Sequence, residues 1–121
     1  MKLKIIDGDY SVCKIENIEQ VNFDEDFVFI GKTDEEISLV CNTLAVPKVT
    51  IERDDNWKAL RVEGQLDFSL VGILAKISNI LADNLISIFV VSTFNTDYIL
   101  VKNVDFDKAI LVLKEENYSI V

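Results

Sequence analysis

The chain has 121 residues, half of them hydrophobic, with a formal net charge of −9 and no histidine. This length suits one ordinary domain or two very small ones, with enough apolar residues to form a core. An acidic chain repels a phosphate backbone, so we expect no nucleic acid partner. The sequence has no run that would span a membrane and opens with no signal-peptide pattern, and we expect a cytoplasmic protein without membrane contact.

The residue types give little support to catalytic or metal chemistry. The chain has no glycine-rich phosphate loop with a lysine, no cysteine beside a base and no repeated carboxylate spacing that would hold a metal. Cys13 and Cys41 each lie in an apolar, strand-like run without a second cysteine or a histidine nearby, which is typical of buried, reduced thiols. We therefore expect no catalytic residues, no metal and no cofactor.

Short apolar runs predict strands in the first half of the chain. Apolar residues on both sides of Asp7–Asp9 indicate two strands joined by a tight turn. Two further strands are expected at Phe27–Gly31 and Glu36–Cys41. Residues 17–26 predict a short helix or a turn, and Pro47 should end a helical turn just before it.

The charged stretch Pro47–Asn56 is the expected boundary between two halves, residues 1–50 and 57–121. Around Thr33, two strands are joined by a turn that contains Thr and Asp. The same pattern occurs around Thr93, which is a weak internal repeat. The first half has the strands but no clear helices, so we interpret it as a degenerate copy of the second.

The second half contains the strongest helical pattern of the chain. Residues 57–63 alternate as a strand, and the apolar residues that follow recur every three or four positions, which predicts a helix with one apolar face. These apolar residues are Leu70, Ile73, Leu74, Ile77, Ile80 and Leu81. Asp67 and Ser69 are placed to cap the start of this helix, and Asn84 is placed to end it.

Two strands, a helix and a last strand complete the second half. The strands are expected at Ile86–Ser92 and Asp97–Val101, with a hairpin turn between them. Asp105 can cap a second helix, and residues 118–121 predict the last strand. From residue 57 the order is therefore β-α-β-β-α-β, the ferredoxin-like arrangement of an α+β domain, with antiparallel sheets and the helices on one face.

The runs GQLDFSLVGILA, ISIFVVST and TDYILV, in this order and spacing, resemble the ACT domain, a small regulatory module that binds amino acids. Among ACT proteins the chain is most similar to the subfamily that includes the arginine-sensing CASTOR proteins and small bacterial relatives. The resemblance covers most of the chain and is strongest from Trp57 onward. It implies an ACT domain at 57–121, preceded by a degenerate ACT-like half at 1–50. In common ACT domains the turn glycine follows the aspartate by three residues, whereas Asp67 and Gly72 are five apart.

A ligand site follows partly from the residues and partly from the resemblance. A helix N-terminus suits a carboxylate, and Asp97, or less favourably Asp67, would accept from an amine. The resemblance implies that the ligand lies between this loop and a neighbouring ACT-like unit, with candidate residues Asp67, Phe68, Ser69, Thr93, Phe94, Asn95 and Asp97. Structural alternatives stay open, because Asp67 can cap the helix and Asp97 can fix the turn.

The leading hypothesis is an amino-acid-binding regulatory or sensor protein, with arginine or another amino acid held between ACT-like units. The alternative is a ligand-free protein-interaction module that uses the ACT fold for dimerisation. An unrecognised enzyme is the least favoured hypothesis. We expect a homodimer, because the strand Ile86–Val91 is apolar on both faces and such strands are usually covered on both.

Overall fold

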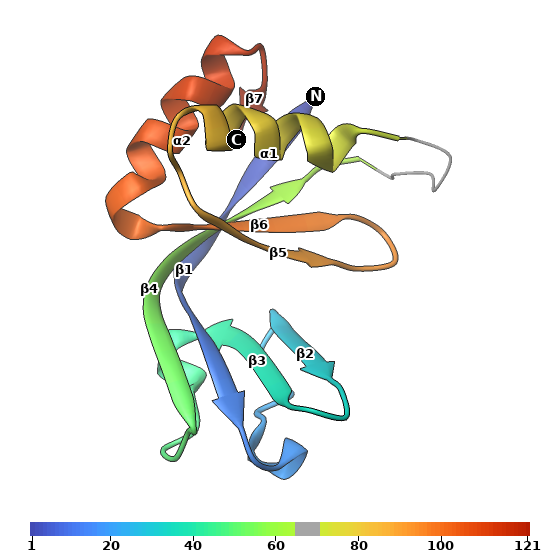
Figure 1. Ribbon diagram of the computed structural model, residues 1–121, viewed down its shortest axis with the longest axis vertical. Coiled ribbons are helices and arrows are strands. Elements are labelled where there is room, and N and C mark those ends of the chain that lie inside the picture. The colour runs from blue at the N-terminus through green and yellow to red at the C-terminus, as the bar shows by residue number, and fades with distance from the viewer. Residues whose placement is uncertain (65–70) are drawn as a thin grey trace. The chain divides into compact units, whose positions relative to one another are not determined.

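The structure is a computed structural model of the chain, and it describes residues 1–64 and 71–121. Its elements are shown in Figure 1 and are β1 (Lys2–Ile15), η1 (Ile18–Gln20), β2 (Val28–Lys32), β3 (Ile37–Asn42), η2 (Thr43–Ala45), β4 (Glu52–Val62), α1 (Ile73–Asp83), β5 (Ile88–Ser92), β6 (Asp97–Lys102), α2 (Asn103–Glu115) and β7 (Ser119–Ile120). They form two compact units, unit 1 with Met1–Asp7 and Lys58–Val121, and unit 2 with Gly8–Trp57.

The N-terminal strand differs from the prediction. We expected a tight turn at Asp7–Asp9, but β1 is a single strand that continues through Gly8. Gly8 has φ +108°, a conformation that glycine adopts readily, so the strand tolerates an irregular residue there without reversing. As a result Met1–Asp7 belongs to unit 1 and not, as the expected division at residues 1–50 implies, to the N-terminal half.

Unit 1 has the predicted ferredoxin-like order, because β4, α1, β5, β6, α2 and β7 follow one another as β-α-β-β-α-β. Its sheet has one additional strand, since the start of β1 lies between β4 and β7. The Glu63 N–H donates to the Lys2 carbonyl at 2.9 Å on one side, and Leu3 pairs with Ile120 on the other. The expected antiparallel sheet is therefore wrong in one place, because β7 runs parallel to the inserted β1.

Both helices of unit 1 pack on the same face of its sheet. Alternate residues of β4 and β6 meet the buried side chains of α1 and α2 in one cluster, as expected for strands whose side chains point to opposite faces in turn. The fully buried members of this cluster include Leu60, Val62, Ile77, Leu81, Ile99, Val101, Ala109 and Leu113. The predicted apolar face of α1 is thus confirmed for Ile77 and Leu81, while Leu70 lies outside the described residues.

The helix ends correct several local predictions. α1 begins after Gly72, which has φ +80°, and the proposed caps Asp67 and Ser69 lie outside the described residues. The left-handed residue at its end is Leu85 and not Asn84. Asn84 instead donates its side-chain amide to the Ile80 carbonyl at 2.8 Å, which pairs one of the last open carbonyls of the helix.

The second helix also begins earlier than predicted. α2 starts at Asn103, two residues before the proposed cap Asp105, and the side chain of its N-cap residue Lys102 makes no capping hydrogen bond. Asp105 lies in the first turn, where a negative charge is favourable because the helix N-terminus carries partial positive charge.

Unit 2 repeats the hairpin of unit 1 without its helices. Val28 pairs with Cys41 across β2 and β3, and sixty residues later Ile88 pairs with Val101 across β5 and β6 in the same register. The three-residue η2 follows β3 where the thirteen-residue α2 follows β6. A small core covers one face of this sheet, built from Cys13, Ile15, Val21, Leu39 and Cys41.

Within residues 1–64 and 71–121, no helix is long and apolar enough to cross a membrane. The same two ranges contain no group of three or more Cys, Asp or Glu side chains arranged to hold a metal ion.

Candidate functional site

The turn between β5 and β6 carries three of the predicted site residues, Thr93, Phe94 and Asn95. It is closed by the Thr93 N–H, which donates to the Thr96 carbonyl at 2.8 Å, and by the Thr96 N–H, which donates to Thr93 Oγ1 at 3.3 Å. The Thr96 hydroxyl donates to the Val62 carbonyl at 2.6 Å. These bonds hold the turn against the end of β4, where the chain leaves the sheet at Gly64.

A pocket of about 510 Å³ opens between this turn and the end of β4. We call it the turn pocket. Its lining residues are Arg61, Val62, Glu63, Gly64, Thr93, Asn95, Thr96 and Tyr98. The structure thus brings Gly64, where the predicted ligand loop begins, together with Thr93 and Asn95 of the predicted turn.

The wall of the turn pocket carries both signs of charge. Arg61 Nε lies 3.0 Å from Glu63 Oε2, and Arg61 Nη1 donates to the Tyr98 hydroxyl at 3.5 Å. Both hydrogen bonds raise the pKa of Arg61, and the bond to Tyr98 has the larger effect. Arg61 therefore keeps its positive charge. The side chains of Arg61 and Glu63 keep 24% and 28% of their surface exposed, so a small ligand can reach both.

Strand alternation explains why these groups share a wall. Leu60 and Val62 point into the helix-covered core, so Arg61 and Glu63 point to the other face of β4. Tyr98 precedes the core residue Ile99 and points to that same face. The turn pocket therefore opens on the side of the sheet away from the helices.

The remaining predicted site residues lie elsewhere. Asp97 pairs with Ser92 across the hairpin, and Asp97 Oδ1 accepts a hydrogen bond from Ser92 Oγ at 2.5 Å. By strand alternation its side chain lies on the face opposite Tyr98. Phe94 is 80% exposed at the tip of the turn. Asp67, Phe68 and Ser69 lie outside the described residues.

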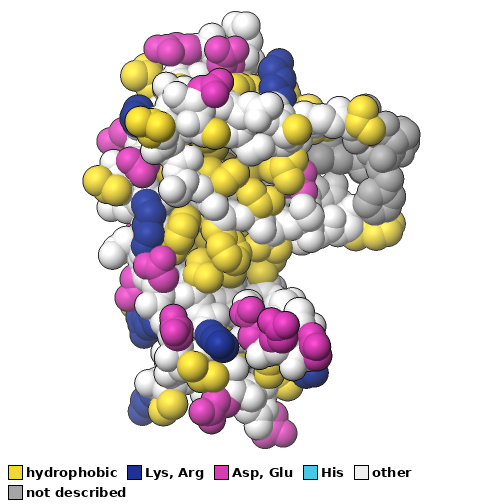
Figure 2. All heavy atoms as spheres, in the orientation of Figure 1, with side chains coloured by type: hydrophobic (Ala, Val, Ile, Leu, Met, Phe, Trp, Pro, Cys, Tyr) yellow, Lys and Arg dark blue, Asp and Glu magenta, His cyan; other side chains and the backbone are white. Residues whose placement is uncertain are grey.

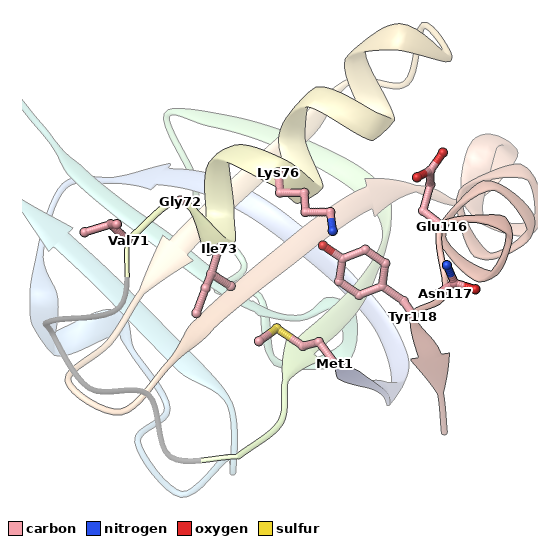
Figure 3. Close-up of a pocket in the computed structure, with 8 residues that line it drawn as sticks. All are labelled: Met1, Val71, Gly72, Ile73, Lys76, Glu116, Asn117 and Tyr118. Atoms are coloured by element: carbon pink, nitrogen blue, oxygen red, sulfur yellow. The ribbon is translucent and has the colours of Figure 1, made fainter.

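The N-terminus of α1 lines a different pocket, of about 350 Å³, shown in Figure 3. Its lining residues are Met1, Val71, Gly72, Ile73, Lys76, Glu116, Asn117 and Tyr118. The Lys76 amine lies over the Tyr118 ring at 5.9 Å from its centroid, and Figure 3 shows this amine pointing toward the ring. Burial is the main cause that raises the pKa of Tyr118, and Glu116 adds to it.

Sequence reasoning placed a helix N-terminus and the hairpin turn in one site, whereas in the structure they line two pockets. It also did not identify Arg61, Glu63 and Tyr98. The alternating pattern of residues 57–63 could have indicated part of this site, because it places the charged residues Arg61 and Glu63 on one face of the strand. Tyr98 joins them only through the pairing of the two strands in the sheet.

Comparison with known proteins agrees with this fold. Residues 52–115 match the family model of the ACT domain, and the chain belongs to the ACT domain family. A solved protein from Agobacterium tumefaciens is 33% identical with a TM-score of 0.86, and the match covers 99% of this chain and 91% of that one. No curated protein matches the chain.

More distant structures share the fold alone. A Vibrio cholerae protein described as a possible transport protein is 19% identical with a TM-score of 0.73, and the match covers 94% of this chain and 88% of that one. Aspartate kinase from Clostridium acetobutylicum, described as an allosteric enzyme, is 17% identical with a TM-score of 0.65. That match covers 91% of this chain but 32% of the kinase, so the chain corresponds to about a third of the enzyme's length.

Proposed function

We propose that this ACT protein is an amino-acid-binding regulatory protein whose ligand lies in the turn pocket. The observation that carries the proposal is the juxtaposition of a guanidinium and a carboxylate, Arg61 and Glu63, on the wall of a pocket in a member of the ACT family. A free amino acid carries one positive and one negative group on neighbouring atoms. Such a pair of side chains is complementary to it.

Each end of the ligand has a matching group in this pocket. The Arg61 guanidinium would donate to the α-carboxylate, because its planar donors match the two carboxylate oxygens. The Glu63 carboxylate would accept from the α-ammonium group. Thr93 and Asn95 line the same pocket and can form hydrogen bonds with either end.

The resemblance to the CASTOR subfamily makes arginine the first ligand to test. In this proposal the loop residues Asp67, Phe68 and Ser69 complete the site, and Phe94 and Asp97 lie near it without lining the turn pocket. An ACT-like unit of a second copy closes it, and the protein acts in the cytoplasm. The acidic composition of the chain is compatible with a cationic ligand side chain.

A thermal-shift screen of the twenty amino acids tests this function. A ligand that binds only the folded protein adds about 2.7 kcal/mol of stability at about a hundred times its dissociation constant, which raises the melting temperature measurably. We expect arginine or another amino acid to raise it, and isothermal titration calorimetry then gives the stoichiometry. If no amino acid shifts the melting temperature at millimolar concentration, the ligand-free interaction module is the correct function.

Two variants and a matched control locate the site. Arg61→Gln and Glu63→Gln each remove one charge of the pocket, and each should weaken binding about tenfold or more, as expected for the loss of one charge-assisted hydrogen bond. Arg53→Gln is the control, because Arg53 pairs with Asp55 at 2.8 Å on the same strand, two residues apart as Arg61 and Glu63 are. Equal losses in all three variants would place the ligand outside the turn pocket.

A further inference from the structure

Unit 2 covers its core with far less helix than unit 1 does. Where α2 follows the hairpin in unit 1, unit 2 has only the three-residue η2, and its other helical turn, η1, also has three residues. The segments that replace a helical layer are residues 17–26 and 43–51. Val21 from the first, and Ala45 and Val46 from the second, pack into the core of unit 2.

These two segments lie together and expose large apolar side chains. Gln20 Nε2 donates to the Val49 carbonyl at 2.9 Å, which ties one segment to the other. Leu44 is 96% exposed, and Phe23 and Val49 are each about two-thirds exposed. We call this surface the η surface, defined by Ile18, Phe23, Leu44, Val49 and Ile51.

The acidity of the chain is concentrated in the same unit. Unit 2 has twelve Asp and Glu against four Lys and Arg, a net charge of −8, while unit 1 has a net charge of −1. The segment that follows β1 contributes Glu16, Glu19, Asp24, Glu25 and Asp26, and it contains no Lys or Arg. Figure 2 shows acidic and hydrophobic side chains next to one another on the surface of unit 2.

We propose that the η surface is a docking site for a basic amphipathic helix of a partner protein. Apolar residues on one face of such a helix would cover Phe23, Leu44 and Val49, and its Lys and Arg residues would face the surrounding carboxylates. The exposed apolar residues and the acidic residues of the same segments are together complementary to such a helix, which presents apolar and basic side chains. Charge argues against a second copy, since two copies of unit 2, each with a net charge of −8, repel each other.

The test uses full-length protein and two synthetic peptides of about 18 residues with identical Leu, Lys and Ala composition. One peptide is patterned as an amphipathic helix and the other is scrambled. We expect the amphipathic peptide to bind, as measured by fluorescence anisotropy, and to shift amide resonances of residues 17–26 and 43–51 in NMR spectra. Raising the salt from about 50 to about 300 mM should weaken binding several-fold, because screening shortens the reach of the carboxylates.

Variants separate the apolar contact from simple charge attraction. The double variant Leu44→Ser/Val49→Ser keeps every charge and should weaken binding about tenfold, as expected when two apolar contacts are lost. Val104→Ser is the control, because Val104 is 88% exposed at the start of α2 in unit 1. Circular dichroism and melting curves check that both variants keep their fold.

Four outcomes would overturn the proposal. They are equal binding of the scrambled peptide, resonance shifts confined to unit 1, unchanged affinity in Leu44→Ser/Val49→Ser, and no binding at millimolar peptide. Self-association of the wild type that the double variant abolishes would assign the η surface to a second copy instead. None of these outcomes depends on the amino-acid site, because the turn pocket is lined by residues of unit 1.

Discussion

The Thr96 hydroxyl donates a hydrogen bond of 2.6 Å to the Val62 carbonyl and thereby ties the β5–β6 turn to the last residue of β4. Thr96→Val keeps the shape but leaves this carbonyl without its partner. We expect a loss of about 1 kcal/mol in the free energy of unfolding, since this is the usual net value of one hydrogen bond. Urea denaturation measures it.

The control for this bond is Thr96→Ser, which retains the hydroxyl. Thr96→Val and Thr96→Ser should differ in stability. They should also differ in ligand affinity, because Thr96 and Val62 both line the turn pocket. Equal stability of Thr96→Val and Thr96→Ser would mean that the bond contributes nothing to the fold.

Asp97→Asn tests whether the charge of this residue serves ligand binding or the turn. Asn keeps an oxygen that can accept from Ser92 Oγ, so the unliganded melting temperature should change little. Binding of a cationic amino acid should weaken modestly, because Asp97 does not line the turn pocket and its charge acts on the ligand only at a distance. Ser92→Ala is the matched control, since it removes the hydrogen bond and keeps the charge. A lower unliganded melting temperature in Asp97→Asn without any ligand effect would make Asp97 a structural residue.

Burial of Cys41 should make the free energy of unfolding depend on pH in the alkaline range. The thiol is 2% exposed, and burial, with a smaller contribution from Cys13, raises its pKa from 9.0 to about 11. The folded protein keeps this proton where the unfolded chain loses it, so the stabilisation is complete below pH 9 and is lost as the pH rises through about 11. The loss should amount to about 2–3 kcal/mol in the free energy of unfolding.

Cys41→Val removes this titration, and Val101 at the matching position of the repeat indicates that valine fits there. Chemical denaturation between pH 8 and about 11 should therefore give a flatter pH profile for Cys41→Val than for the wild type. Identical slopes would mean that the Cys41 thiol titrates normally in the folded state.

We also predict a homodimer formed along β5, one of the two outer strands of the unit 1 sheet. The residues from Ile88 to Val91 are half-buried, and an open strand edge is a natural pairing surface. Val91→Lys places a charge on this edge and should give a monomer by light scattering. Gly31→Lys is the control, because Gly31 has the matching place on β2. A monomeric wild type across the micromolar range would exclude the dimer.

Local patterns in the sequence predicted most of unit 1. The spacing of Ile77 and Leu81 identified the buried face of α1, and both are fully buried. The Thr33 and Thr93 turns indicated a repeat, and the two hairpins share one register. These features depend on residues close together in the chain, where periodicity and turn chemistry are informative.

Contacts between distant residues were not predictable in the same way. Nothing near Leu3 indicates that its strand enters the unit 1 sheet beside Ile120, because that pairing joins opposite ends of the described chain. The residues that line the turn pocket could not be predicted to lie together for the same reason. Arg61 and Tyr98 are far apart in sequence and come together only when β4 and β6 become neighbours.

The position of β1 in the unit 1 sheet has a consequence for folding on the ribosome. Residues 8–57 are contiguous, so unit 2 has all its strands soon after they are synthesised. The first residues of β1 pair with β7, which is synthesised more than a hundred residues later. Until then, one edge of this part of β1 has no strand partner. Since contacts of such long sequence separation form slowly, we expect a nascent chain in which unit 2 is folded while unit 1 is still incomplete.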